Sequence, residues 1–314
     1  MSHSTAAKTI SVAIATYNGV NYLAEQLESI LKQTRPAADI IIVDDCSQDG
    51  TWQLLHRYQQ KYSRVIKIFC NNQNIGACKT FERAVNLTSG DYVALADQDD
   101  IWLETKLALL VNEIGDGELI HSDAIVINNQ QQVINPSLLA LIGFKADCTF
   151  FERLLREGVH GCCLMMSRKV ANLAKTIPDG FVFHDFYYNL VAAASGKVLT
   201  YPGALIYYRV HDNNACGLDT KISYARLTAL YHKNLNNMQL LAHDPLFCNY
   251  TEAITFYIGY YQAILELKPC KISFIYQVVL RLGTAKGVAL LLVKIFGSGL
   301  LQTIYNLQAK WRKD

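Results

Sequence analysis

Two aspartates that are separated by one residue, Asp97 and Asp99, follow an apolar run over residues 92–96. Such a run predicts a buried strand, and both carboxylates at its end can turn toward a single cation. Mg²⁺ and Mn²⁺ prefer oxygen ligands of this kind, with water and substrate phosphates completing the shell. The spacing therefore predicts a Mn²⁺ or Mg²⁺ site. The alternative is a solvated acidic loop in which Asp100 caps a helix that begins near Glu104.

A second acidic pair, Asp44 and Asp45, ends the apolar run over residues 40–43. A carboxylate at this position suits either an N–H group of a nucleobase or a metal ion. The plain alternative is a cap on the following helix, with Ser47 or Asp49 as the capping residue.

Asn74 and Gly76 open a predicted helix over residues 76–87. A helix N-terminus offers backbone N–H groups and a positive dipole end to a phosphate, and a glycine lets that phosphate approach closely. An ordinary turn glycine explains the same residues equally well.

The elements that must position these side chains alternate along the first hundred residues. Apolar, β-branched runs predict four strands, over residues 10–15, 40–43, 65–69 and 92–96. Three- and four-residue periodicity predicts three helices, over residues 20–31, 51–62 and 76–87. This alternation predicts an α/β fold with a doubly wound, mostly parallel sheet. Ligands of such sheets bind outside the carboxyl ends of the strands, where both acidic pairs lie.

The second half of the chain has a weaker pattern. We expect short strands over residues 118–121, 163–166 and 205–208, and a helix over residues 184–194. Helices rich in Leu, Ile and Tyr follow from about residue 221. We therefore expect one domain over residues 1–217 and a helical C-terminal extension over residues 218–314.

Composition argues against nucleic acid as a partner. The formal net charge is only +2, so the chain as a whole lacks the positive charge that attracts a phosphate backbone. The N-terminal residues contain no apolar segment of the secretory type, so we expect a cytoplasmic protein. The chain contains nine cysteines and no CxxC pair, which argues against zinc.

A basic C-terminal segment covers residues 268–313, with eight Lys or Arg residues and no acidic one. Apolar stretches over residues 272–282 and 288–296 lie between them. Basic amphipathic helices of this kind favour peripheral contact with an anionic membrane surface. A helical cap with a solvated basic face is the alternative.

Four segments, in this order, resemble the family 2 glycosyltransferases of the GT-A fold. They are Ala15-Thr16-Tyr17-Asn18, residues 42–51 (IVDDCSQDGT), Asn74-Ile75-Gly76 and residues 96–100 (ADQDD). The resemblance extends over about residues 10–217. His184-Asp185 and residues 208–214 (YRVHDNN) also resemble the bacterial rhamnosyltransferase-like subgroup.

The resemblance implies a nucleotide diphosphate sugar as donor and assigns roles by position. Ala15, Tyr17 and Asp45 fall where the family holds the nucleoside, and Asn18, Asn74 and Gly76 belong to the same matched segments. Asp97 falls near the ribose and the metal, and Asp99 falls on the main metal ligand. Arg209 and His211 fall where a closing loop meets the diphosphate, with His211 as a further metal ligand.

Asp185 falls on the catalytic base of the family. This chain departs from the family's pattern at two places. An Ala-Arg-Asn triplet is replaced by residues 80–82 (TFE), so Lys79 or Arg83 has to supply that phosphate contact. The usual Glu-Asp pair is His184-Asp185, which leaves His184 as a rival base or as a polar residue at a helix N-terminus.

Together these features predict an inverting transfer of a sugar, with dTDP-rhamnose as the favoured donor, to a hydroxyl of a sugar or a lipid-linked sugar acceptor. Such a reaction would serve bacterial surface polysaccharide synthesis at the cytoplasmic face of the inner membrane. A nucleotidyltransferase is the nearest alternative, although residues 16–19 (TYNG) lack the basic residues it usually carries after its first strand. A receiver-like signalling domain and a non-catalytic protein that binds sugar nucleotides are more distant alternatives.

Overall fold

The computed structural model describes residues 8–144, 146, 148–155, 159–211 and 224–265. The chain divides into two compact units. Met1–Asp179 and Phe183–Ala215 form the first unit, and Gly180–Val182 and Cys216–Asp314 form the second. The domain boundary predicted at residue 217 lies outside the described residues and stays a prediction.

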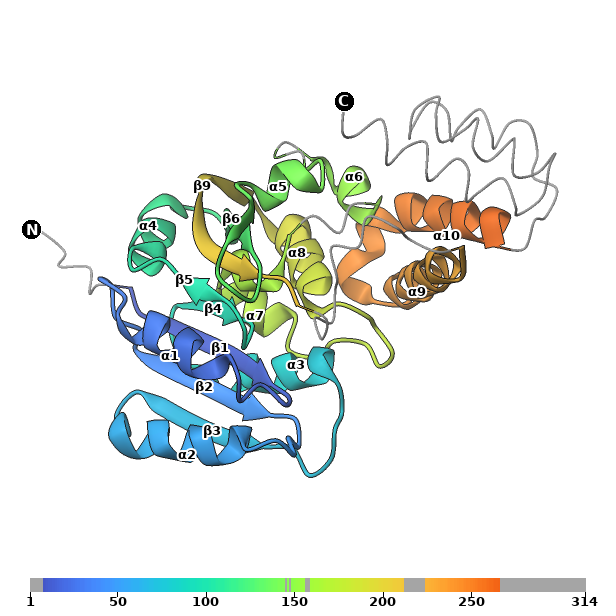
Figure 1. The fold of residues 1–314 in the computed structure, drawn as a ribbon. Helices are drawn as coiled ribbons and strands as arrows, with labels where there is room; N and C mark the ends of the chain where they lie inside the picture. The colour runs from blue at the N-terminus through green and yellow to red at the C-terminus, as the bar shows by residue number, and fades with distance from the viewer. Residues whose placement is uncertain (1–7, 145, 147, 156–158, 212–223, 266–314) are drawn as a thin grey trace, which may run out of the picture. The chain divides into compact units, whose positions relative to one another are not determined.

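The first four strands form a parallel sheet in the order β3-β2-β1-β4 (Figure 1). They are β1 (Ile10–Thr16), β2 (Asp39–Asp44), β3 (Ile66–Cys70) and β4 (Tyr92–Ala96). The helices between them are α1 (Leu23–Leu31), α2 (Thr51–Lys61) and α3 (Ala77–Leu87). Every residue of β2 is buried, as expected for a strand that is covered on both faces. The predicted α/β fold is confirmed, and it brings the carboxyl ends of β1, β2 and β4 to one edge.

Beyond β4 the sheet becomes mixed. β8 (Leu164–Ser167) pairs antiparallel with β4 and β6 (Leu119–Ile127), and β6 pairs parallel with β9 (Val198–Arg209). β5 (Ile101–Trp102) and β7 (Val133–Asn135) complete the sheet at β9 and β6. β6 is longer than predicted because it buries the polar side chains of His121 and Ser122, which interrupt the apolar pattern.

Short helices cover the second half of this sheet. They are α4 (Lys106–Glu113), α5 (Leu138–Leu141), α6 (Phe150–Leu155), the 3-10 helix η1 (Gly161–Cys163), α7 (Arg168–Leu173) and α8 (His184–Ser195). α8 begins where the sequence predicts it. Phe183, the residue before it, has a φ of 73°, a backbone conformation that turns the chain sharply into the helix.

The second unit contains α9 (Tyr224–Ala242), the 3-10 helix η2 (Pro245–Tyr250) and α10 (Thr251–Leu265). Asn237 of α9 is buried and exchanges two hydrogen bonds of 2.9 Å with the backbone of Val182. Within the described ranges, no helix is long and apolar enough to cross a membrane. The basic segment over residues 268–313 lies outside those ranges.

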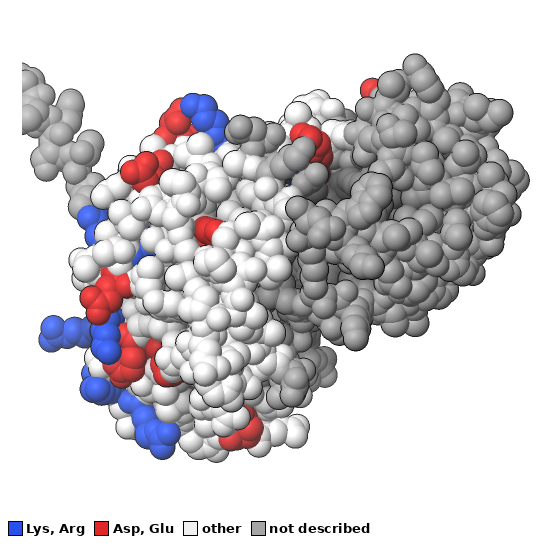
Figure 2. All heavy atoms as spheres, turned by 45° about the horizontal axis from the view of Figure 1, so that its top comes forward, with Lys and Arg blue, Asp and Glu red and all other residues white. Residues whose placement is uncertain are grey.

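Charged side chains of both signs gather along one edge of the face drawn in Figure 2, where Lys and Arg alternate with Asp and Glu. Most of the remaining described surface on that face carries neither sign. No continuous basic patch is visible among the described residues of this view.

Candidate active site

The turn after β4 holds the two aspartates that the sequence marks as metal ligands. Gln98, which lies between them, accepts a hydrogen bond from the Tyr17 N–H (2.9 Å) and donates one to the Tyr17 carbonyl (3.0 Å). The side-chain amide thus binds the backbone after β1 as a neighbouring strand would. Because of this pair, the loop after β1 and the turn after β4 form one surface.

Asp99 lies at the outer side of that turn, close to the end of β9. Its Oδ2 is 2.9 Å from Nε2 of His211, and the His211 ring stacks on Tyr22 with the ring centres 4.7 Å apart. The structure therefore brings together Asp99 and His211, two of the three predicted metal ligands, from segments more than one hundred residues apart.

Arg209, whose contact with the diphosphate stays a prediction, is held by partners within the chain. Its side chain is only 2% exposed. Its Nη2 pairs with Glu25 at 2.6 Å, its Nε donates to the Asp99 carbonyl, and its backbone N–H donates to Asp100. The guanidinium is directed toward α1 and the turn after β4 because these partners neutralise and satisfy it in a buried position.

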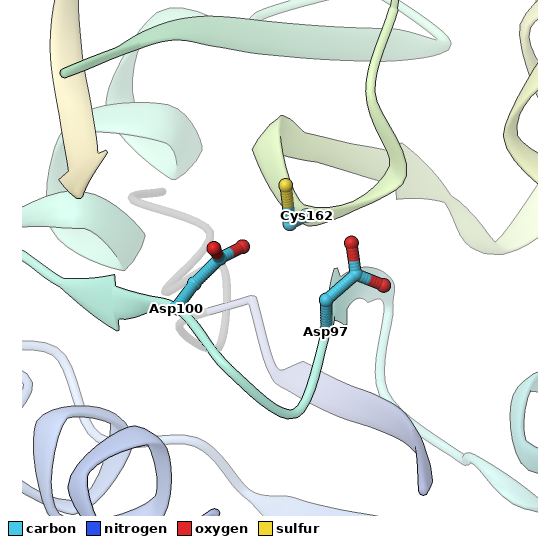
Figure 3. Close-up of side chains that lie close together, drawn as sticks. All are labelled: Asp97, Asp100 and Cys162. Carbon is cyan, nitrogen blue, oxygen red and sulfur yellow. The ribbon is translucent and has the colours of Figure 1, made fainter. Parts of the chain in front are cut away.

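Asp97 and Asp100 gather with Cys162 of η1, and their ligand atoms lie within 4.8 Å of one another. Figure 3 shows the two carboxyl groups and the thiol facing a common space. Burial, with the charges of Asp100, Asp99 and Asp185, raises the pKa of Asp97 well above its ordinary value. Burial and the charge of Asp99 raise the pKa of Asp100 to about 7. Asp100 therefore belongs to this buried cluster and does not cap a helix; α4 has no side-chain cap.

The donor set fits a hard or borderline cation. As the predicted ligands, Asp97 and Asp99 would supply carboxylate oxygens and His211 an imidazole nitrogen, a combination that suits Mn²⁺. Among the described residues, the ligand atoms that gather as a possible metal group are those of Asp97, Asp100 and Cys162. A hydrogen bond with Cys163 and burial raise the pKa of the Cys162 thiol, so the protonated sulfur is a poor ligand. One oxygen of Asp100, Oδ2, is buried without a hydrogen-bond partner, which leaves acceptor capacity within the cluster.

Asp45, the predicted contact to the base, is buried and fully engaged with the chain. It accepts hydrogen bonds from the amide of Asn71 (2.7 Å), the Ile75 N–H (2.9 Å) and the Gly76 N–H (2.8 Å). The start of α3 is therefore bonded to a carboxylate of this chain. In this structure the Gly76 N–H donates to Asp45, and its role toward a phosphate stays a prediction.

The two basic residues that were expected to replace the missing family arginine point elsewhere. Lys79 donates to the carbonyl of Ile177 (2.6 Å) and pairs with Glu82 (3.1 Å) and Asp179 (2.8 Å). The interpretation of Lys79 as a phosphate ligand is therefore not what the structure shows.

Arg83 donates to the Cys70 carbonyl and to the side chain of Asn71. Both contacts hold the end of β3. Neither alternative for the missing arginine thus reaches the turn that contains Asp97 and Asp99.

The remaining predicted donor residues lie at the same edge of the sheet. Ala15 is half-buried near the end of β1, Tyr17 is 45% exposed, and Asn74 is exposed in the loop before α3. Asn18 has a φ of 49° and binds the next loop, where its Oδ1 accepts from the Gln48 N–H at 2.8 Å. Asp45 follows β2 at this same edge.

Asp185 lies in the first turn of α8 and faces η1. Its Oδ2 accepts a hydrogen bond from the Gly161 N–H (3.0 Å) and its Oδ1 accepts from Phe186 (2.8 Å). The charge of Asp185 acts on both Asp97 and the buried His160. The predicted base and the predicted metal ligands therefore face one region.

His184, the rival base, packs against α3. Its ring stacks on Phe81 with ring centres 3.9 Å apart, and its Nε2 is buried with no hydrogen-bond partner. Burial lowers the pKa of His184, so the ring is neutral. These contacts favour a packing role for His184.

Three site residues escaped the sequence analysis as parts of the site. Gln98 stands between the two predicted metal ligands, Tyr22 lies inside the predicted helix over residues 20–31, and no role is assigned to Cys162 from the sequence. No local pattern distinguishes the first two. The adjacent Gly161-Cys162-Cys163, which precedes an apolar strand, was the one signal available for the third.

Comparison with known proteins agrees with this geometry. The family model described as Glycosyl transferase family 2 matches residues 11–173, which is more than half of the chain. The protein belongs to this family. The match spans the loop after β1, both acidic pairs and η1, and so includes most of the site described above.

The relatives of this family 2 glycosyltransferase include proteins of bacterial polysaccharide synthesis. The dTDP-rhamnosyl transferase RfbG of Shigella flexneri is 28% identical over 255 residues, which cover 75% of this chain and 86% of the relative. The putative teichuronic acid biosynthesis glycosyltransferase TuaG of Bacillus subtilis is 37% identical over 98 residues, 31% of this chain and 38% of that protein.

Two solved structures share the fold of this glycosyltransferase. S. aureus TarS 1-349 in complex with UDP-GlcNAc has a TM-score of 0.59 at 15% identity, covering 96% of this chain and 92% of that chain. The mannosyltransferase PcManGT from Pyrobaculum calidifontis, in complex with GDP-Man and Mn²⁺, has a TM-score of 0.55 at 15% identity, covering 98% and 87%.

Proposed function

We propose that this protein is a metal-dependent, inverting glycosyltransferase that transfers rhamnose from dTDP-rhamnose to a hydroxyl of a sugar or lipid-linked sugar. The observation that carries the proposal is the placement of Asp185 within electrostatic reach of Asp97 while the Gly161 N–H fixes it. A base on one side of a site and metal ligands on the other fit a direct displacement. The relative RfbG, a dTDP-rhamnosyl transferase, supports the choice of donor.

In this mechanism the donor nucleotide lies at the carboxyl ends of β1 and β2, near Tyr17 and Asp45. Asp97, Asp99 and His211 would hold Mn²⁺ or Mg²⁺, which neutralises charge on the departing diphosphate. Asp185 accepts the proton of the acceptor hydroxyl while the hydroxyl oxygen attacks the anomeric carbon of the donor sugar. One displacement at that carbon inverts its configuration, and no second carboxylate is required.

The proposal also includes the acceptor and the place in the cell where the reaction occurs. TuaG is named as a putative teichuronic acid biosynthesis glycosyltransferase, which supports a role in surface polysaccharide synthesis. A lipid-linked sugar acceptor at the cytoplasmic face of the membrane completes the proposal. The basic segment over residues 268–313 would supply peripheral contact with anionic lipid.

Incubation of the purified protein with a panel of labelled nucleotide sugars, acceptor lipid extract and Mn²⁺ tests the proposal. Release of dTDP from dTDP-rhamnose together with labelled lipid supports it. Release of pyrophosphate from a sugar phosphate and a nucleoside triphosphate would instead indicate a nucleotidyltransferase. Binding of the nucleotide sugar without release of any product would indicate a non-catalytic protein.

A further inference from the structure

Lys106 is the first residue of α4 and is completely buried, an uncommon position for a lysine. Its Nζ donates a hydrogen bond to the backbone carbonyl of Cys162 and lies 3.6 Å from the ring centre of Trp102. Burial lowers the pKa of Lys106 to about 8, and the nearby Cys163, Cys162, Asp100 and Asp97 oppose this shift. A buried ammonium ion needs partners of this kind, and together they restrict Lys106 to one position.

The carbonyl that Lys106 holds belongs to η1, the segment that fixes Asp185. Gly161, the residue before Cys162, donates its N–H to Oδ2 of Asp185 at 3.0 Å. The backbone of η1 lies directly against the start of α8, since a Cβ atom on Gly161 would lie 2.9 Å from Nε2 of His184. Lys106 thus anchors one residue of η1 while its neighbour holds Asp185.

Cys162 also connects this anchor to the metal side of the site. Its thiol gathers with the carboxyl groups of Asp97 and Asp100 (Figure 3). The same residue therefore contacts Lys106 through its backbone and the aspartates through its side chain. A displacement of Lys106 would move η1 relative to both.

We propose that Lys106 is a positioning residue of the transfer reaction, which holds the backbone of Cys162 so that Gly161 keeps Asp185 aimed at the acceptor hydroxyl. This inference rests on the proposed function, because it takes Asp185 as the base. Lys106 does not touch the substrate and acts through η1 alone.

Lys106→Met keeps the unbranched side chain up to its last atom and removes its hydrogen-bond donor and its charge. We expect kcat to fall about 10- to 100-fold, as for a misplaced catalytic group, while the Kd of the donor nucleotide stays within about twofold. Lys197→Met is the matched control, because Lys197 is exposed and its ion pair among the described residues is with Asp116. An unchanged kcat in folded Lys106→Met would overturn the inference.

A double-mutant cycle distinguishes positioning from a general structural role. In the Asp185→Asn background, Lys106→Met should reduce kcat by less than about twofold, because its target is already disabled. If the two losses multiply, Lys106 does not act through Asp185 and the inference is wrong. If Asp185→Asn alone keeps normal transfer, the assigned base fails instead, which is a separate result.

Lys106→Gln keeps a hydrogen-bond donor for the Cys162 carbonyl without the charge. We expect it to recover part of the lost kcat. If circular dichroism and Tm show that Lys106→Met does not fold, Lys106→Gln replaces it in the double-mutant cycle with Asp185→Asn. A Lys106→Gln protein that folds and shows losses that multiply with Asp185→Asn contradicts the inference equally.

Discussion

Nε2 of His211 lies 2.9 Å from Oδ2 of Asp99, and this contact joins the segment after β9 to the turn after β4. Tyr22 supports the imidazole from α1's N-terminal side by stacking on it. The pair therefore depends on three segments that only the folded sheet brings together.

Removal of the imidazole should weaken the metal site. For His211→Ala we expect the Mn²⁺ concentration for half-maximal transfer to rise about 10- to 100-fold, because one ligand or orienting partner is lost. A Mn²⁺ titration of initial rates measures this. His243→Ala is the control, since His243 is exposed in the second unit. An unchanged Mn²⁺ requirement would remove His211 from the site.

Asp99 should be indispensable for turnover. We expect a chelator to abolish transfer and Mn²⁺ or Mg²⁺ to restore it, and we expect Asp99→Ala to be inactive at any metal concentration. Its Tm should stay close to that of the wild type, because the loss of the contact with His211 is offset by the loss of charge repulsion with Asp97 and Asp100. Full activity in the presence of chelator would show that no metal is needed.

Asp185→Asn separates a base from a structural carboxylate. The amide can still accept the hydrogen bond from Gly161, so the fold and the binding of donor nucleotide should be retained. Because the amide cannot take a proton, transfer should slow at least about 100-fold. Calorimetric binding of dTDP and single-turnover rates test the two halves. Near-normal transfer would reassign the base, with His184 as the next candidate.

Asp45 is expected to matter for stability as well as for the donor. Asp45→Ala leaves the N–H groups of Ile75 and Gly76 and the amide of Asn71 without their acceptor. We expect the free energy of unfolding to fall by about 3 kcal/mol. Urea unfolding measures this, with Asp49→Ala, at a more exposed position, as comparison. Unchanged stability would mean that the loop rearranges without cost.

His121 should make stability depend on pH. Burial, with the charge of Arg153, lowers the pKa of His121 to about 4, below the ordinary value of about 6.5 in an unfolded chain. The unfolded state therefore binds the proton first as the pH falls. This contribution to stability is complete above about pH 6.5 and is lost progressively down to about pH 4. At pH 5 the free energy of unfolding has fallen by about 2 kcal/mol for this reason.

The measurement compares urea midpoints at pH 7.5 and pH 5.0 for the wild type and for His121→Leu, which cannot titrate at this position. The variant should lose less stability than the wild type between the two pH values. An equal loss in both proteins would show that His121 does not contribute to the pH dependence.

Local sequence pattern was sufficient to predict the parallel half of the fold and the edge at which the site lies. Unbroken apolar runs such as residues 40–43 are compatible only with burial on both faces, and alternation with helices imposes a parallel sheet. The acidic pairs follow these runs directly, so their place at the carboxyl edge was predictable from local pattern. The start of α8 at His184 agrees with the helix that the sequence predicts over residues 184–194.

The hydrogen-bond and ion-pair partners of the predicted site residues became known from the folded structure alone. Arg209 binds Glu25, Gly76 binds Asp45, and Lys79 binds the chain near Ile177, although each was expected at a phosphate. These pairings depend on distances between segments far apart in sequence, which periodicity does not encode. Each buried charge or N–H group must also find a partner inside the fold, and that requirement is satisfied by whichever segment packs beside it.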